Sequence, residues 1–219
     1  MTEGSILAKN IERLEKDLFK IGHLVEEMMK MVIQALREQK AELALQVIEL
    51  DDQVDNLQIV IEEEIEHIAL NMPMHGFDLR RYFATIKMVN DIERIGDYAC
   101  NIAEIVLELK NETYMKPLEH IPQLADLAMK MVTTVIQAFL AKDVDLAEAV
   151  CKKDDEADNL YDEIREELIK LTSQESNAQK AYQSSRFLLV AEWLERTADH
   201  ATNIGEETIY IGTGKRVKY

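Results

Sequence analysis

The sequence is poor in residues that interrupt helices. It contains three Pro and seven Gly among 219 residues, and residues 23–72 and 123–204 contain neither. Pro and Gly end or weaken helices, whereas sheet proteins use them repeatedly in their turns. The abundant Leu, Ala, Glu and Lys are good helix formers. The composition therefore excludes a β-sandwich, a β-barrel or a Rossmann-type sheet and predicts long helices.

Cysteine and basic residues are scarce as well. Cys100 and Cys151 stand far apart, so the chain lacks the close-spaced pairs that hold zinc or exchange disulfides. The 25 Lys and Arg are outnumbered by 42 Asp and Glu, which leaves a formal net charge of −17. Because so acidic a surface repels phosphodiester backbones, we expect no direct binding of nucleic acid.

Long apolar runs are also missing. No segment reaches the roughly 18 consecutive apolar residues of a membrane helix. Residues 1–5 (MTEGS) lack the basic start and apolar stretch of a signal peptide. We therefore expect a cytoplasmic protein. Hydrophobic residues still make up 47% of the chain, which is enough to build a sizeable core.

The chain contains an internal duplication. Three blocks of the first half return in the second half in the same order, 102 or 103 positions later: residues 32–36 (VIQAL) as 135–139 (VIQAF), 51–57 (DDQVDNL) as 154–160 (DDEADNL), and 93–104 (ERIGDYACNIAE) as 195–206 (ERTADHATNIGE). A period this long is far from that of a solenoid repeat. Each half is therefore expected to be one folded unit.

The few breakers divide each half into three helices. Pro73 and Gly76 end one helix before Asp78, the expected cap of the next, and Pro117 lies in the expected linker between the halves. Residues 172–179 (TSQESNAQ) offer two capping boxes. The helices are expected at about 5–38, 41–71, 78–110, 118–140, 143–171 and 176–211. The prediction is an all-α fold of two tandem three-helix bundles, residues 1–112 and 113–219.

Carboxylate pairs at i and i+4 recur at equivalent positions of the two halves. They are Asp51 with Asp55, Glu93 with Asp97, Asp154 with Asp158, and Glu195 with Asp199. On a helical wheel the pairs lie on polar faces. Like charges at this spacing destabilise an isolated helix by roughly 0.2–0.5 kcal/mol per pair, and a solvated acidic face does not require the same acids in both halves. Because oxygen-rich clusters suit Mg²⁺, Mn²⁺, Ca²⁺ or ferric iron, the pairs predict metal sites. The alternative is a structural bundle whose acidic faces bind nothing.

Five further residues are candidates for the same sites, as extra ligands or as hydrogen-bond partners of ligands. They are Glu62, Asn101, Glu104, Asn203 and Glu206. Glu62 of the first half aligns with Arg165 of the second. We therefore expect tighter or larger metal loading in the first bundle.

A catalytic alternative has less support. Glu64 and His67 have the Glu-x-x-His spacing of ferritin-like di-iron oxidases, but such a site needs two of these motifs and the chain has no second. Because Gly-rich phosphate loops and nucleophile elbows are also missing, we expect no enzymatic activity. Residues 215–218 (KRVK) are expected to form a frayed basic end.

The two copies 93–104 and 195–206 resemble the signature of the PhoU family, and the resemblance extends to Pro73, to residues 78–80 (DLR) and to the Asp-x-x-x-Asp pairs. It covers nearly the whole chain. It implies two three-helix bundles related by pseudo-twofold symmetry, with the four carboxylate pairs binding iron or zinc clusters on the surface.

The resemblance also implies a function. It suggests a negative regulator of phosphate uptake and phosphate-starvation signalling. Such a regulator acts through a phosphate-sensing histidine kinase and the ATPase of the phosphate ABC transporter, and meets the membrane only through these partners. We also expect a homodimer.

Overall fold

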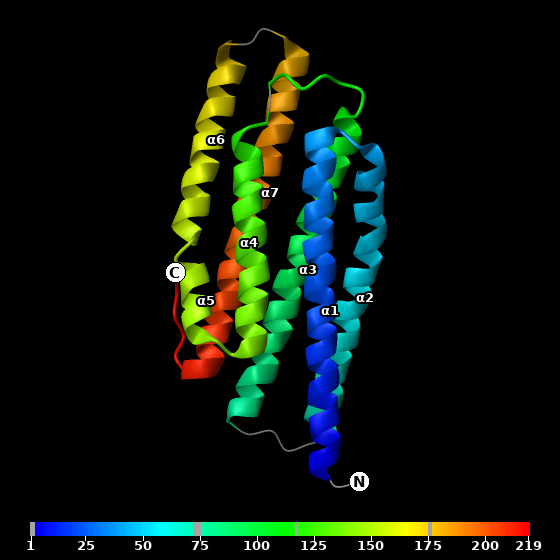
Figure 1. Cartoon of the computed structure of the whole chain (residues 1–219), viewed down its shortest axis with the longest axis vertical. Helices are drawn as coiled ribbons and strands as arrows, with labels where there is room; N and C mark the ends of the chain where they lie inside the picture. The colour runs from blue at the N-terminus through cyan, green and yellow to red at the C-terminus, as the bar shows by residue number, and fades with distance from the viewer. Residues whose placement is uncertain (1–2, 72–75, 117, 175–176) are drawn as a thin grey trace.

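The computed structural model describes residues 3–71, 76–116, 118–174 and 177–219. These parts contain helices and no strand. The helices are α1 (Glu3–Glu38), α2 (Ala41–Asn71), α3 (Phe77–Leu109), α4 (His120–Ala141), α5 (Val144–Cys151), α6 (Asp154–Gln174) and α7 (Ala178–Thr213). They run up and down the long axis of the molecule (Figure 1).

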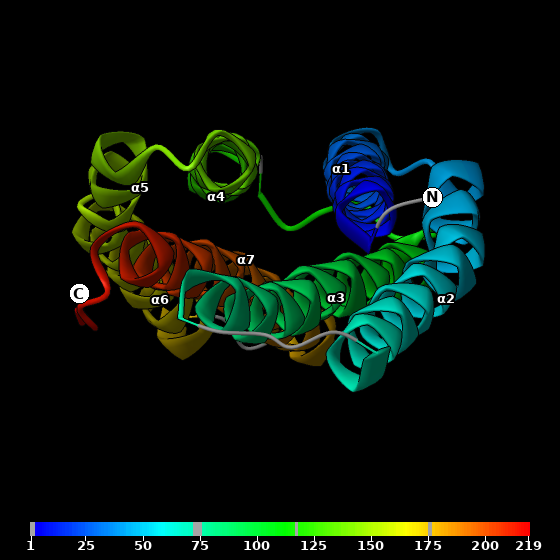
Figure 2. The ribbon, with the colours of Figure 1, turned by 90° about the horizontal axis from the view of Figure 1, so that it is seen from below.

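The helices form two bundles with equivalent arrangements. The first consists of α1, α2 and α3, and the second of α4, the pair α5–α6, and α7. In a view along the helices, α3 and α7 lie side by side in the middle, α1 and α4 lie on one side of them, and α2 and α5–α6 lie at the flanks (Figure 2). The all-α fold of two related three-helix bundles is thus confirmed.

The two bundles share one hydrophobic core. Buried side chains of α1–α3 and of α4, α6 and α7 belong to a single contiguous cluster, because α3 packs along α7 and α1 packs on α4. A small second cluster joins Ala138, Ala147, Cys151 and Ile209. The joint between the bundles is therefore packed like the interior of a domain.

The expected helix 143–171 is wrong in one respect, because the structure divides it into α5 and α6. Lys153 N donates to Val150 O at 2.8 Å, which tightens the last turn of α5, and neither Gly nor Pro stands at the break. At the break α5 lies close to α7: a Cβ on Gly205 would lie 2.6 Å from Cys151 Sγ. In the first bundle Ala103 takes the place of Gly205, and α2 stays continuous.

Two of the expected caps are also wrong. Asp78 lies inside the first turn of α3, where Gly76 occupies the cap position without a side-chain hydrogen bond. Thr172 lies within α6, and its hydroxyl donates to Leu168 O at 2.8 Å. The cap of α7 is Asn177, whose Oδ1 accepts from Gln179 N at 2.8 Å. The predictions at Pro73, Pro117 and residues 175–176 lie outside the described residues.

Among the described helices, α4 alone is long and apolar enough to cross a membrane by length and composition. It packs against α1, α5, α6 and α7, and ten of its side chains are buried. The core helix of a helical bundle has the same length and composition, so these two properties do not make α4 a membrane span.

Candidate metal site

Three of the predicted ligands of the second bundle meet between α6 and α7. Asp158 projects from α6, and Glu195 and Asp199 project from one face of α7. One carboxylate oxygen of each lies within 4.8 Å of the other two. We call these three residues the second cluster. It is the one group of metal-capable side chains found in the described parts of the chain.

Lost hydration and mutual repulsion raise the pKa values of all three carboxylates in the second cluster. Loss of hydration raises the pKa of Glu195 to about 7, and the charges of Asp199 and Asp158 add to the rise. Lost hydration, followed by the charges of Asp154 and Asp158, also raises the pKa of Asp199. The pKa of Asp158 is raised by lost hydration and by Asp154. A cation among these groups would offset both effects.

The donor set fits a hard cation. Oxygen ligands surround such ions at about 2.0–2.6 Å, so three oxygens on one ion lie within roughly 5 Å of each other. The second cluster meets that condition without a rearrangement of the helices. The fourth predicted ligand, Asp154, stands at the first residue of α6, and its Oδ1 accepts from Thr202 Oγ1 at 2.8 Å.

The predicted ligands of the first bundle do not converge in the same way. Asp51 and Asp55 lie on α2, and Glu93 and Asp97 lie on α3; no metal-capable group forms from described residues there. Arg94 Nη1 binds Asp97 Oδ2 at 2.7 Å. Its Nε lies 3.6 Å from Glu93 Oε2. The arginine thus neutralises part of the negative charge of Glu93 and Asp97.

The pKa values of the first bundle reflect the same crowding of acids. Lost hydration raises the pKa of Asp51, and the charges of Asp55 and Asp97 add to it. The pKa of Glu93 is raised by lost hydration and by Asp97. The geometry nevertheless favours a cation in the second bundle. The sequence led us to expect tighter metal loading in the first bundle, and that expectation stays a prediction.

Of the five further candidates, Glu62, Asn203 and Glu206 contact residues outside the second cluster. Glu62 Oε1 accepts from Asn90 Nδ2 at 3.5 Å and from Gln58 Nε2 at 3.4 Å. Asn203 Nδ2 donates to Asp91 Oδ1 at 3.5 Å. Asn101 is half-buried and Glu104 is exposed on α3. None of them belongs to the second cluster.

Glu206 is engaged by the segment that follows α7. Gly214, with a φ of 73°, turns the chain back, and Tyr219 N then donates to Glu206 Oε1 at 2.9 Å. Lys218 Nζ lies 3.8 Å from the same oxygen. The expectation that residues 215–218 form a frayed end is therefore wrong.

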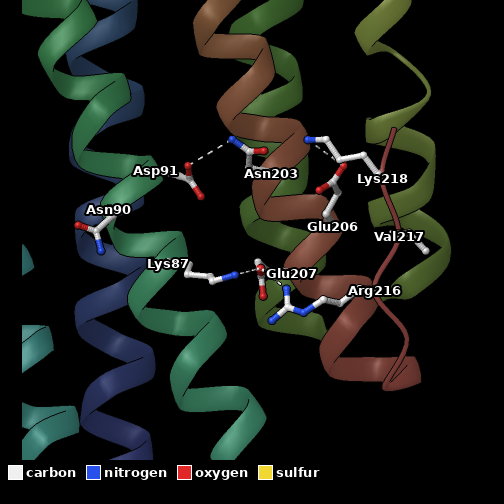
Figure 3. Close-up of a pocket in the computed structure, with 9 residues that line it drawn as sticks. All are labelled: Lys87, Asn90, Asp91, Asn203, Glu206, Glu207, Arg216, Val217 and Lys218. Carbon is white, nitrogen blue, oxygen red and sulfur yellow. Dashed lines mark hydrogen bonds and ion pairs between the residues drawn. The ribbon is translucent and has the colours of Figure 1, made fainter.

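The returning segment forms one wall of a cavity of about 530 Å³ between α3 and α7 (Figure 3). At its base the buried Glu207 Oε1 binds Lys87 Nζ at 2.5 Å and Arg216 Nη1 at 3.1 Å. Lys218 is held by Glu206. Each lysine or arginine that lines the cavity is thus paired with a carboxylate.

Sequence reasoning missed the polar contacts between the bundles. His200 Nδ1 lies 2.7 Å from Asp91 Oδ1, and His200 Nε2 lies 3.3 Å from Tyr98 Oη. These residues join α3 to α7 next to both acidic sites. The signal was present in the internal alignment, which places Tyr98 and His200 at equivalent positions.

The Glu-x-x-His motif does not form a metal site in the structure. Glu64 Oε1 binds Arg13 Nε at 3.2 Å. His67 is exposed, and its Nδ1 lies 3.2 Å from Asn71 Nδ2. Neither residue belongs to the metal-capable group.

The chain is similar to known proteins in sequence and in fold. A family model described as the PhoU domain matches residues 18–106 and 121–208. A curated relative from Clostridium acetobutylicum, named phosphate-specific transport system accessory protein PhoU homolog, is 35% identical over 213 residues, which cover 97% of this chain and 96% of the relative. The relative from Thermotoga maritima named phosphate-specific transport system accessory protein PhoU homolog 1 is 36% identical. The match covers 96% of this chain and 90% of the relative. The crystal structure of PhoU from Pseudomonas aeruginosa superposes with a TM-score of 0.91 at 29% identity, over 95% of this chain and 99% of that chain.

Proposed function

The chain belongs to the PhoU family, and on that premise we propose that it is a cytoplasmic, metal-binding regulator of phosphate uptake and phosphate-starvation signalling. Its curated relatives are named accessory proteins of the phosphate-specific transport system. A regulator of this kind acts through protein contacts and needs no catalytic turnover.

The second cluster carries the metal part of the proposal. Asp158, Glu195 and Asp199 present three carboxylates within 4.8 Å of one another, and lost hydration and mutual repulsion raise the pKa of each. A bound cation would supply positive charge that keeps all three ionised and ties α6 to α7. The all-oxygen donor set suits ferric iron or Mn²⁺, and carboxylates also bind zinc.

Metal content and melting temperature test this site. The chain is stripped with a chelator, then loaded separately with Fe³⁺, Zn²⁺ and Mn²⁺, and bound metal is counted by mass spectrometry. We expect about one ion per chain and a rise in melting temperature, since a ligand that binds only the folded state stabilises it. Asp158→Asn/Asp199→Asn should abolish both effects.

The matched control lies in the first bundle. Asp55→Asn/Asp97→Asn removes the equivalent acids there and should leave the ion between α6 and α7 in place. Equal losses in the two variants would show that the second cluster is not the preferred site. A larger loss of bound metal in Asp55→Asn/Asp97→Asn would support the expectation, drawn from Glu62 and Arg165, that the first bundle binds metal more tightly.

The partners require a separate test. We propose contacts with the transporter ATPase and with the phosphate-sensing histidine kinase, and a homodimer, as the family resemblance implies. The chain should capture the ATPase and the kinase from solution to different extents at high and low phosphate, and sedimentation should give the mass of two chains. Capture of both partners to the same extent at high and low phosphate would contradict the regulatory role. A sedimentation mass of one chain would contradict the dimer.

One further experiment separates the regulator from a di-iron oxidase. The chain is loaded with ferrous iron without oxygen and then exposed to oxygen. Because Glu64 Oε1 is paired with Arg13 Nε at 3.2 Å, and neither Glu64 nor His67 belongs to the metal-capable group, we expect static binding. Repeated, rapid oxidation of added ferrous iron would instead support the oxidase.

A further inference from the structure

Arg94 and Arg196 occupy equivalent positions of the duplicated signature but have different partners. Arg94 Nη1 binds Asp97 Oδ2 at 2.7 Å, within the acidic site of its own bundle. Arg196 Nη2 binds Glu192 Oε1 at 2.7 Å, one turn before the second cluster. Arg94 therefore pairs with an acid of its own site, whereas Arg196 pairs with an acid outside the second cluster.

The residue four positions earlier explains the difference. Glu192 supplies a carboxylate to Arg196, whereas the equivalent residue before Arg94 is Asn90. The Asn90 amide is engaged elsewhere: it donates to Ile86 O at 2.8 Å, and its Oδ1 accepts from Gln58 at 2.9 Å. Without an acid at that position, Arg94 pairs with the acid three residues later.

A second difference concerns the surroundings of the two arginines. Arg196 interacts with Tyr98 on α3 as well as with Glu192, and the charge of its neighbour Glu195 is the weakest of these influences. The equivalent of Tyr98 in the other copy is His200, and His200 Nδ1 lies 2.7 Å from Asp91 Oδ1. Arg196 thus has two partners outside the cluster, and both are replaced in the environment of Arg94.

We propose that Glu192 is a positioning residue that keeps the second cluster open to a cation by holding Arg196 away from Asp199. Asn90 offers no carboxylate to Arg94, so Arg94 pairs with Asp97, and the positive charge in the first bundle is that of the arginine. This inference rests on the metal binding proposed above. It assigns the difference between the two sites to Glu192 and Asn90 rather than to the ligands themselves, which the duplication preserves.

A double-mutant cycle on Mn²⁺ affinity tests the role of Glu192. The first bundle is silenced with Asp51→Asn/Asp55→Asn, and affinity is then measured for Glu192→Gln, Arg196→Ala and their combination. In Glu192→Gln, Arg196 should turn onto Asp199 and weaken binding by about tenfold. In the absence of Arg196, Glu192→Gln should have almost no effect. Glu192→Asp, which keeps the charge, should retain most of the affinity.

The first bundle provides the reciprocal test. With Asp154→Asn/Asp158→Asn silencing the second cluster, Asn90→Glu should draw Arg94 away from Asp97 and tighten Mn²⁺ binding by several-fold, and Arg94→Ala should do the same. Melting temperatures without metal identify any variant that fails to fold. A crystal structure of metal-free Glu192→Gln supplies a readout that does not depend on metal.

The outcomes separate the two proposals. Equal weakening by Glu192→Gln with and without Arg196 would show that Glu192 acts only as a distant charge, and would overturn the positioning role while leaving the metal site intact. Absence of Mn²⁺ binding in every variant would overturn the metal site. In that case the crystal structure of Glu192→Gln tests the positioning role by itself. An Arg196 side chain that contacts Asp199 supports the role, and an Arg196 side chain in its original position overturns it.

Discussion

Tyr98 and His200 occupy the same position in the two copies of the duplicated unit and contact one another. Tyr98 Oη lies 3.3 Å from His200 Nε2, and the ring centroids are 5.6 Å apart. Equivalent residues meet only near the axis that relates the two copies, so this pair marks the pseudo-twofold axis between α3 and α7. Asp91, which belongs to the first bundle, binds His200 of the second bundle. This contact makes the joint between the bundles chemically asymmetric.

Removal of the histidine should weaken the joint between the bundles. His200→Ala leaves the half-buried Asp91 carboxylate without its 2.7 Å partner, and we expect a loss of about 1–2 kcal/mol in the free energy of unfolding. Tyr98→Phe removes only one hydroxyl contact and should cost less. Urea denaturation measures both. A larger loss in Tyr98→Phe than in His200→Ala would contradict the assignment of the stronger contact to Asp91.

The metal-free protein should lose stability as the pH rises toward neutrality. Lost hydration, aided by the charge of Asp199, raises the pKa of Glu195 to about 7 from an ordinary value of 4.5. Between these pH values the folded chain holds a proton that the unfolded chain releases. The contribution of Glu195 to stability is therefore largest at low pH and falls until the pH passes about 7.

Glu195→Gln isolates this contribution, since glutamine stays neutral. The melting temperature of the variant, relative to the natural chain, should rise between about pH 5 and about pH 8 in the presence of chelator. Glu163→Gln, at an exposed position of α6, is the control for a general loss of negative charge. A constant difference between Glu195→Gln and the natural chain would contradict the raised pKa.

The close approach of α5 to α7 makes Gly205 sensitive to substitution. A Cβ there would lie 2.6 Å from Cys151 Sγ and 3.3 Å from Ala147 O. We expect Gly205→Ala to destabilise the protein by about 1–3 kcal/mol. Adding Cys151→Ala should recover part of the loss.

Gly96 is the matched control in the first copy of the signature. The nearest atom to a Cβ at that position is Val54 Cγ1 at 3.5 Å, an ordinary contact. Gly96→Ala should therefore be neutral or stabilising, by up to about 1 kcal/mol, because alanine favours the helix. Equal destabilisation by the two substitutions would show that helix packing at Gly205 is not the cause.

Glu207 should contribute more to stability than the exposed acids of the surface, because it is buried. Its carboxylate is 8% exposed and holds both Lys87 and Arg216. Glu207→Gln leaves two cations without their partner and should cost about 1–2 kcal/mol. It should also speed tryptic cleavage after Arg216, because the segment 215–219 loses an anchor. Lys87→Ala removes an exposed partner and should cost less than about 1 kcal/mol. Unchanged cleavage in Glu207→Gln would contradict the anchoring of the segment.

Much of the architecture was determined by local properties of the sequence. Long stretches without Gly or Pro make helices, and the equivalence of residues 93–104 and 195–206 makes two similar bundles. The i,i+4 spacing of Glu195 and Asp199 places both on one helix face. These features depend on the geometry of a single helix, which a sequence pattern reports directly.

The tertiary structure decided what depends on the distance between helices. The break between α5 and α6 lies where Cys151 contacts Gly205 on α7, and neither Gly nor Pro stands at residues 152–153. Convergence of Asp158 with Glu195 and Asp199 required α6 to lie against α7 in one register. The partner chosen by each arginine depended on which acid lay within about 3 Å, and such short-range electrostatics cannot be read from carboxylate spacing alone. The sequence thus determined which residues face the sites, and the packing decided which site has room for a cation.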